Sequence, residues 1–324
     1  MTIPTPTPPH DAPWKGPKDV PRGEELAPGS SLCAGCGGLL TLRLFLKALG
    51  KPAVVVNGAG CMTLMATYPY TPLKGSWLYT TMSGPAASAQ GIRDALDVLR
   101  TSQRIAAEDD LEVVVLAGDG SSYDMGLAPT SAAIHRGLDF WYLCYDNEAY
   151  GNTGFQLSPS SPFGSETTTS PVDAREPEGT IQQKKDLFEI WRAHRPPYVA
   201  TLSPHDPVDL DAKICRAKER RGPKLLLALA PCPTGWGFEP ELSMELARKA
   251  VDCGIWPLEE SIDGAVRHTR IPRRRHPVAE YLELQRRFRH LFHPERHETA
   301  LAAIQARVDA YWERVHSLES GGPV

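Results

Sequence analysis

The sequence lacks long apolar runs, a strong net charge and internal repeats. No apolar run reaches the roughly 18–20 residues that a membrane-spanning helix needs, and the N-terminus does not show a basic segment followed by an apolar one. These absences predict a soluble, cytoplasmic protein without a membrane partner. The formal net charge of −4 over 324 residues also provides no bulk attraction to nucleic acid.

Structural disulfides are not expected either, although the chain has seven cysteines. The cytosol keeps thiols reduced, so clustered cysteines in such a chain indicate metal or redox chemistry. Cys33 and Cys36 form a Cys-x-x-Cys unit followed by two glycines, Cys61 ends the segment GAGC, and Cys232 follows the apolar run 225–230. On chemistry alone, four such thiolates would suit either a [4Fe–4S] cluster or a structural zinc ion.

The other three cysteines fall inside regular elements, where a free thiol usually acts as a small buried hydrophobe. They are Cys144, Cys215 and Cys253. Cys215 is the alternative to Cys232 as a fourth ligand.

The most informative stretch of the sequence runs from residue 111 to residue 154. The run Val113–Ala117 is typical of a parallel strand buried on both faces, and Gly118-Asp119-Gly120 follows it. A second apolar run, Phe140–Tyr145, leads to Asn147. If the two strands are parallel neighbours, Asp119 and Asn147 meet where open α/β sheets bind ligands. Two hard oxygen ligands there would suit Mg²⁺ bound together with phosphate oxygens, whereas the glycines alone would fit an ordinary β-turn.

Alternating strand and helix patterns predict an α/β fold with a parallel sheet. Expected strands are 53–57, 113–117, 140–145, 198–202 and 225–230. Expected helices are 39–49, 125–136, 180–194, 207–221, 241–254, 278–292 and 298–317, and residues 77–103 predict a loop that leads into a helix from about residue 83.

Three regions follow from this pattern. Residues 1–31 are proline-rich and predict an arm, with Trp14 as its only obvious anchor, either disordered or laid across a partner subunit. Residues 32–236 predict the α/β domain, and residues 237–324 a mainly helical C-terminal extension. Within the α/β domain, the long Ser/Thr/Pro stretch 155–179 has no apolar period, and a loop of this length in a compact domain is usually either functional or a flexible insert.

The Gly118-Asp119-Gly120 and Asn147 pair resembles the thiamine diphosphate motif, and its continuation DNEAYGNTG is more specific. It resembles the beta subunits of pyruvate:ferredoxin oxidoreductase and the related 2-oxoacid:acceptor oxidoreductases. The resemblance implies a thiamine diphosphate-binding parallel-sheet fold in which Asp119, Asn147 and the carbonyl of Ala149 hold Mg²⁺. It also implies cofactor contacts from Gly118, Gly120, Asn152 and Thr153, and an ordered lid over the cofactor formed by residues 155–179.

The cysteine segments CAGCG, NGAGC and APCPTGW are similar to the cluster-binding segments of the same family. The resemblance therefore implies a [4Fe–4S] cluster on Cys33, Cys36, Cys61 and Cys232. One departure is Gly38, at a position where some relatives carry Glu. That difference removes an acid/base or phosphate contact at Gly38 but leaves the cluster ligands unchanged.

The function implied is oxidative decarboxylation of a 2-oxoacid to acyl-CoA and CO₂, or the reverse, through a thiamine diphosphate enamine. Electrons would leave through the cluster to ferredoxin, and coenzyme A would be a co-substrate. No catalytic carboxylate for the aminopyrimidine is recognisable in this chain. The family places it on an alpha subunit, so the chain is expected to be inactive alone and to assemble with alpha, gamma and ferredoxin-like delta subunits or domains.

Pyruvate is the expected substrate because YPYTP and PCPTGW resemble the pyruvate branch. Phenylglyoxylate, oxalate, 2-oxoglutarate and branched-chain oxoacids stay open. Two other classes are also possible: a non-redox thiamine diphosphate decarboxylase or synthase, which would not need the cysteines, and a zinc-binding module, which would need only them.

Overall fold

In the computed structural model, the residues described are 12–66, 71–106, 110–272 and 274–319. The first eleven residues of the arm and most of the YPYTP segment fall outside these ranges. None of the described helices is both long and apolar enough to cross a membrane.

A single eight-stranded sheet organises the described chain, with strand order β2-β1-β3-β4-β6-β5-β7-β8. The first six strands in this order are parallel, and β7 and β8 are added antiparallel at one edge. The strands are β1 (Ala53–Gly58), β2 (Ser76–Thr80), β3 (Glu112–Gly118), β4 (Trp141–Asp146), β5 (Tyr198–Leu202), β6 (Lys224–Leu229), β7 (Leu258–Ile262) and β8 (Ala265–Arg270).

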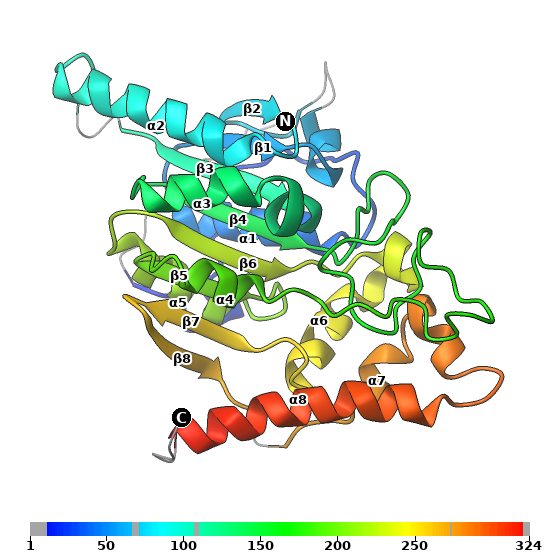
Figure 1. The fold of residues 1–324 in the computed structure, drawn as a ribbon. Coiled ribbons are helices and arrows are strands. Elements are labelled where there is room, and N and C mark those ends of the chain that lie inside the picture. Colours follow the sequence, from blue (N-terminus) through cyan, green and yellow to red (C-terminus); the bar gives the residue numbers. More distant parts are fainter. Residues whose placement is uncertain (1–11, 67–70, 107–109, 273, 320–324) are drawn as a thin grey trace.

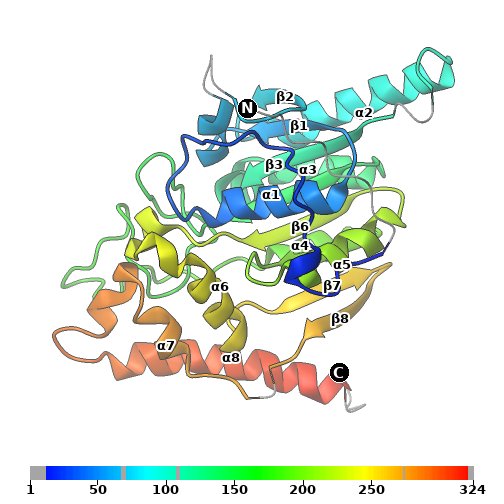
Figure 2. The ribbon, with the colours of Figure 1, turned by 180° about the vertical axis from the view of Figure 1, so that it is seen from behind.

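Helices cover both faces of this sheet (Figures 1 and 2). They are α1 (Gly37–Leu49), α2 (Pro85–Thr101), α3 (Leu127–His135), α4 (Leu187–Arg192), α5 (Pro207–Lys218), α6 (Ser243–Asp252), α7 (Val278–Leu282) and α8 (Glu298–Glu319). Figure 1 shows α2, α3 and α4 on one face, and Figure 2 shows α1 and α5 on the other. The expected α/β class with a parallel central sheet is therefore confirmed.

Alternate side chains of the central strands enter two separate cores, as the pleat requires. In β3, Val113 and Val115 pack in one hydrophobic cluster and Val114 and Leu116 in the other. This two-sided burial explains why the β3 sequence is continuously apolar instead of alternating.

The C-terminal region differs from the mainly helical expectation. It forms α6, α7 and α8, but it also contributes β7 and β8 to the sheet, and its side chains share a core with the central strands. The sequence does not predict β7 because the strand is short and carries two glutamates, Glu259 and Glu260, which are buried and paired. The sheet and the core both continue across residue 236. The expected domain boundary at this residue stays a prediction.

Two expected helices are shorter than their patterns. The helix expected over 180–194 is the shorter α4, which begins only at Leu187. Asp186 caps its N-terminus by accepting the Glu189 N–H at 3.0 Å. Upstream, Thr180 bonds to Ser165 in the preceding loop. The helix expected over 278–292 ends at Leu282 and is followed by a 3₁₀ turn, Arg286–Leu291.

The described part of the arm lies on this chain itself. Trp14 is buried, and its backbone N–H donates to Asp211 Oδ2 of α5 at 2.7 Å. Leu26 then pairs with Leu73 beside the edge strand β2. An apolar site on the chain's own α1 and α5 face therefore orders the arm at Trp14 and Leu26, and its contact with a partner subunit stays a prediction.

Candidate cofactor and metal site

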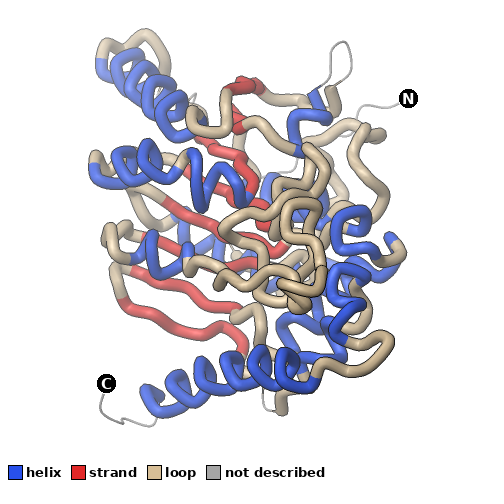
Figure 3. The backbone as a smooth tube through the Cα atoms, turned by 45° about the vertical axis from the view of Figure 1, so that its right-hand side comes forward, coloured by secondary structure: helices blue, strands red, loops and turns tan. Residues whose placement is uncertain are grey.

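The functional side chains gather where the parallel strands end. Loops from β1, β3, β4 and β6 meet at this edge, and Figure 3 shows them massed on one side of the molecule. Asp119 follows β3, Asn147 follows β4, Cys61 follows β1 and Cys232 follows β6. The expected meeting of Asp119 and Asn147 rests on the parallel pairing of β3 with β4, which the register shows.

The Gly118-Asp119-Gly120 segment connects β3 directly to helical turns and is not an isolated β-turn. A π-helical turn, Ser121–Met125, leads on into α3. Gly120 has no room for a side chain, because a Cβ added there would lie 2.1 Å from the ring of Tyr150. Glycine is therefore needed at this position, because the backbone passes close to a tyrosine ring.

Three polar groups of the expected cation site converge. One end of the Asn147 amide lies 2.8 Å from Asp119 Oδ1 and 2.9 Å from the Ala149 carbonyl oxygen. Without a cation, the amide nitrogen turned to this side donates to both oxygens. With the amide oxygen there, it stands from each of the other two oxygens at about the 2.9 Å separation that adjacent ligands have in an Mg²⁺ octahedron. The donor set and its spacing thus fit Mg²⁺.

Asp119 is buried and held by the long Ser/Thr/Pro segment. Its Oδ2 accepts a hydrogen bond from Ser158. Burial raises the pKa of Asp119 well above its usual value, and the nearby negative charge of Asp146 raises it further. A cation at this position would supply the positive charge that the carboxylate lacks.

A buried ion-pair network lies beneath the β4 loop. Lys184 Nζ contacts Asp146 Oδ2 at 2.8 Å and Glu148 Oε1 at 2.9 Å, and Arg287 donates to Glu148 Oε2 at 2.6 Å. Burial alone would lower the pKa of Lys184, but the charges of Asp146 and Glu148 raise it. Glu148 has a φ of +63°, a left-handed conformation that non-glycine residues rarely adopt. The ion pairs hold this conformation, and it is next to the Ala149 carbonyl that faces the cation site.

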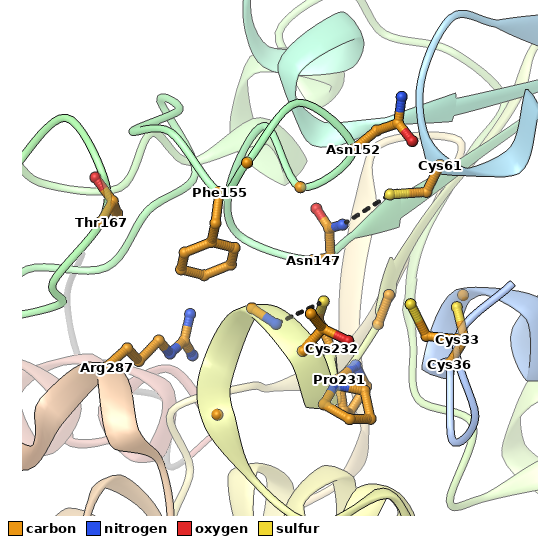
Figure 4. A pocket seen from close by; sticks show the side chains of 18 of the residues that line it. Cys33, Cys36, Cys61, Asn147, Asn152, Phe155, Thr167, Pro231, Cys232 and Arg287 are labelled. Atoms are coloured by element: carbon orange, nitrogen blue, oxygen red, sulfur yellow. Dashed lines mark hydrogen bonds between the residues drawn. The ribbon is translucent and has the colours of Figure 1, made fainter.

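The four expected cluster cysteines line one cavity of about 740 Å³. Figure 4 shows Cys33 and Cys36 together at the right, Cys232 to their left at a similar height, and Cys61 above them. Their position as common lining of one cavity agrees with the expected set, and their role as ligands stays a prediction. Cys215, the alternative, lies on α5 and does not line this cavity.

The thiols are not packed as a single metal ion would need. Among the described residues, no group of three or more His, Cys, Asp or Glu side chains is close enough to hold one ion. Four cysteines around one zinc ion would have their sulfurs about 3.8 Å apart. The binding of a [4Fe–4S] cluster by these cysteines therefore stays a prediction.

Burial shapes the acidity of these thiols. It raises the pKa of Cys61 to about 12 and that of Cys232 to about 11, and the neighbouring cysteines add to both shifts. The thiols of Cys61 and Cys232 are therefore protonated at neutral pH, and metal binding to them must release protons.

Close packing fixes the Cys-x-x-Cys loop against the strand end before Cys232. A Cβ added at Gly37 would lie 2.5 Å from Pro231, and Gly35, at φ +71°, would meet the carbonyl oxygen of Pro240 at 2.5 Å. A Cβ at Gly38 would lie 2.6 Å from Met62. The Glu that some relatives carry at this last position would not fit without rearrangement.

A second cavity, of about 400 Å³, adjoins the first. It is lined by Gly118, Asp119, Gly120, Asn147, Ala149, Asn152 and Thr153, which are the residues expected to contact the cofactor. Asn152 is exposed and faces both cavities. The Thr153 hydroxyl instead donates to Gln156 at 2.5 Å, within its own loop.

Several functional residues were not found from the sequence. They are Tyr145, Glu148, Ser158, Lys184, Trp236 and Arg287, all of which contact the two cavities or the groups that line them. Only Glu148 and Trp236 lie inside motifs that carried the family resemblance. For Lys184 and Arg287 no local pattern exists, because their partners are distant in the sequence.

A mostly parallel α/β sheet with an acid–amide oxygen group at its carboxyl edge is the architecture of diphosphate-binding domains in thiamine enzymes. The family profile for the thiamine pyrophosphate enzyme, C-terminal TPP binding domain, matches residues 58–228. By fold, the chain is similar to a 2-oxoglutarate:ferredoxin oxidoreductase from Magnetococcus marinus, solved with 2-oxoglutarate, coenzyme A and succinyl-CoA bound. The TM-score is 0.54 at 21% identity, with 73% of this chain and 83% of that chain covered.

Curated relatives are closer in sequence. The pyruvate synthase subunit PorB of Methanothermobacter thermautotrophicus is 44% identical over 90% of this chain and 97% of its own. That of Methanocaldococcus jannaschii is 43% identical over 84% and 91%. The ketoisovalerate oxidoreductase subunit VorB of Pyrococcus horikoshii is 37% identical over 92% and 94%. The chain therefore belongs to the 2-oxoacid oxidoreductase subunit family that contains PorB and VorB, and it carries that family's thiamine diphosphate-binding domain.

Proposed function

We propose that this chain is the beta subunit of a pyruvate:ferredoxin oxidoreductase and holds the diphosphate of thiamine diphosphate, Mg²⁺ and a [4Fe–4S] cluster. The observation that carries the proposal is the adjacency of two cavities, one lined by the Asp119 oxygen group and the other by four cysteines. They share Cys61, Tyr145 and Asn147 as a common wall. A non-redox thiamine enzyme needs the first cavity only, and a zinc module needs only cysteines.

The cation site would be formed by Asp119 Oδ1, the side-chain oxygen of Asn147 and the Ala149 carbonyl, with diphosphate oxygens completing the octahedron. Ser158 orients the Asp119 carboxylate, and the Glu148–Lys184 pair fixes the loop that presents Ala149. Thiamine diphosphate, when bound, supplies the electron sink for breaking a carbon–carbon bond next to a carbonyl. The chain's own residues bind, orient and partly bury it.

Cluster binding by Cys33, Cys36, Cys61 and Cys232 would place an electron acceptor behind the wall of the diphosphate cavity. The Gly235 N–H donates to Cys232 Sγ at 3.3 Å, so one sulfur already has a donor of the kind that stabilises cluster thiolates. Coenzyme A would accept the acyl group, as it is bound by the 2-oxoglutarate enzyme of similar fold.

The proposed partner is an alpha subunit that supplies the pyrimidine-activating carboxylate. Exposed apolar side chains rim the diphosphate cavity, namely Leu64, Tyr79 and Met125, which are 40%, 54% and 50% exposed. Exposed apolar groups beside a cavity are typical of a surface that another chain covers. Gamma and ferredoxin-like delta subunits would complete the complex and pass electrons to ferredoxin in the cytoplasm.

Pyruvate is the proposed substrate because the PorB relatives above are more similar than VorB. The test is coenzyme A-dependent reduction of an electron acceptor by the complex co-purified anaerobically with its partner subunits. Pyruvate should be oxidised at least about tenfold more efficiently, by kcat/KM, than 2-oxoisovalerate or 2-oxoglutarate. Decarboxylation without electron transfer would contradict the proposal, and preference for another oxoacid would correct the substrate.

A further inference from the structure

The wall between the two cavities contains one side chain with a polar atom on each side. One end of the Asn147 amide faces Asp119 and Ala149, at 2.8 and 2.9 Å, and the other end lies 3.9 Å from Cys61 Sγ. The dashed line in Figure 4 marks this second contact. Asn147 is therefore the side chain through which the two sites touch.

The backbone of Asn147 is held in place, but its side-chain amide can adopt two orientations that exchange its oxygen and nitrogen. The Asn147 backbone carbonyl accepts the Trp236 indole N–H at 2.9 Å, and the side chain is 6% exposed. Without a cation, N–H groups turned toward Asp119 and Ala149 satisfy both oxygens, and the amide oxygen then faces the sulfur. With a cation, the oxygen must face the cation, so the N–H groups face Cys61 Sγ.

Space for this contact depends on a glycine. A Cβ added at Gly151 would lie 2.7 Å from Asn147 Nδ2 and 3.5 Å from Cys61 Sγ. The amide nitrogen would have to move away from the sulfur to avoid it. The absence of a side chain at Gly151 thus leaves space for the Asn147 amide nitrogen beside the Cys61 sulfur. Gly151 itself is not one of the expected cation ligands.

We infer that Asn147 couples the two sites: cation binding turns its N–H toward Cys61 Sγ and thereby raises the reduction potential of the cluster. The inference rests on the proposed function, because it needs both the cation and the cluster. Its physical basis is that an N–H donated to a cluster thiolate stabilises the extra negative charge of the reduced state. Asn147 acts here as a positioning residue, and the cluster would accept electrons more readily once the diphosphate is in place.

The test uses the full chain with its cluster reconstituted anaerobically from iron and sulfide. The midpoint potential is measured by EPR-monitored redox titration, with and without saturating Mg²⁺ and thiamine diphosphate. In the wild type the potential should rise on adding them. In Asn147→Thr, which keeps an oxygen for the cation and has no amide N–H, only the smaller rise from the cation's charge should remain. Gly151→Ala should also reduce the rise, and it carries the test if Asn147→Thr does not fold.

Asn57→Thr is the matched control, because Asn57 is a buried asparagine at the end of β1 whose amide donates to Thr63. It should keep the wild-type rise. Equal rises in the wild type, Asn147→Thr and Gly151→Ala, with calorimetry showing that Mg²⁺ still strengthens thiamine diphosphate binding, would overturn the inference alone. Failure of the wild-type chain to take up a cluster, or of the chain together with its alpha subunit to bind the diphosphate with Mg²⁺, would instead overturn the proposed function with it.

Discussion

At the scale of single residues, the carboxylate of Asp119 is held by the hydroxyl of Ser158, which lies in a segment without regular secondary structure. Ser158 is 4% exposed and donates to Asp119 Oδ2, while its own backbone N–H donates to Ser161 Oγ at 3.0 Å. Partners of this kind orient the groups that bind a metal ion, and their loss weakens binding without removing a ligand.

Ser158→Ala should therefore weaken Mg²⁺-dependent binding of thiamine diphosphate by about 10- to 100-fold. Isothermal titration calorimetry on the purified chain measures this effect. Ser170→Ala is the matched control, because Ser170 is buried in the same segment but bonds only to Thr167 and Thr180. Equal losses in the two variants would show that Ser158 acts through general stability and not through Asp119.

Glu259 on β7 makes the chain's stability depend on pH. Burial raises its pKa to about 7, although Tyr311 donates a hydrogen bond to its Oε2 at 3.0 Å. The folded state then binds a proton that the unfolded state releases above its lower pKa, so stability falls as pH rises from about 4.5 to 7.

Glu259→Gln should remove this part of the pH dependence and make the chain roughly 3 kcal/mol more stable than the wild type at about pH 8. Urea unfolding between about pH 5 and pH 8 measures the difference. The exposed Glu283→Gln should follow the wild-type curve. A constant difference between Glu259→Gln and the wild type across this range would contradict the assigned pKa shift.

At the scale of elements, the β4 loop depends on a charge network contributed by two distant segments. Lys184 precedes α4, Arg287 lies in the 3₁₀ turn after α7, and both contact Glu148 in its left-handed conformation. Removing one partner of a buried pair leaves an uncompensated charge, which costs more than the pair contributes.

Lys184→Met should accordingly destabilise the chain by about 3–5 kcal/mol, because Asp146 and Glu148 lose the same partner. Urea denaturation measures the free energy of unfolding. Lys185→Met is the matched control: Lys185 is exposed, and its contact is a single hydrogen bond of 3.2 Å to the Tyr123 carbonyl. A loss below about 1 kcal/mol in Lys184→Met would show that the network does not hold the loop.

The N-terminal arm is an element that packs without regular secondary structure. Trp14 is 5% exposed in the core beside α1 and α5. Trp14→Ala should lower the free energy of unfolding of the isolated chain by about 3–5 kcal/mol, and Trp14→Phe by clearly less. No loss in the isolated chain, with a loss only in the assembled complex, would mean that the arm is anchored on a partner.

Local sequence patterns predicted the elements whose apolar residues directly follow the burial of the element in the fold. The β3 and β4 strands are buried on both faces, so their apolar runs identified them and placed Asp119 and Asn147 at one edge. The edge strands β2 and β8 were missed because their exposed residues give no such run, and β7 was missed because buried glutamates interrupt its apolar residues. The helix α4 was overestimated because a tertiary contact of Thr180 overrides helical propensity.

The candidate site was predicted as far as its motifs extend. The four cysteines and the Asp119–Asn147 pair lie in short segments that resemble a known family, and the structure brings each set to a common cavity. Ser158, Lys184 and Arg287 could not be found in this way. Their roles arise from contacts between segments far apart in the chain, which no spacing rule encodes.

At the scale of the whole molecule, one edge of the sheet brings together loops from four strands. The order of β1, β3, β4 and β6 in the sheet makes Cys61, Asp119, Asn147 and Cys232 neighbours although they span much of the chain. The parallel sheet thus places an oxygen site and a thiol site side by side, which is the arrangement that the proposed redox function needs.

The central claim is that the four thiols of the cavity bind a four-iron cluster. Iron and acid-labile sulfide analysis of the anaerobically purified full chain, read with the EPR spectrum after reduction, tests it most directly. The account predicts about four iron and four sulfide per chain, falling by most of that amount in Cys61→Ala and unchanged in Cys215→Ala. Stoichiometric zinc without iron, or equal iron loss in both variants, would contradict it.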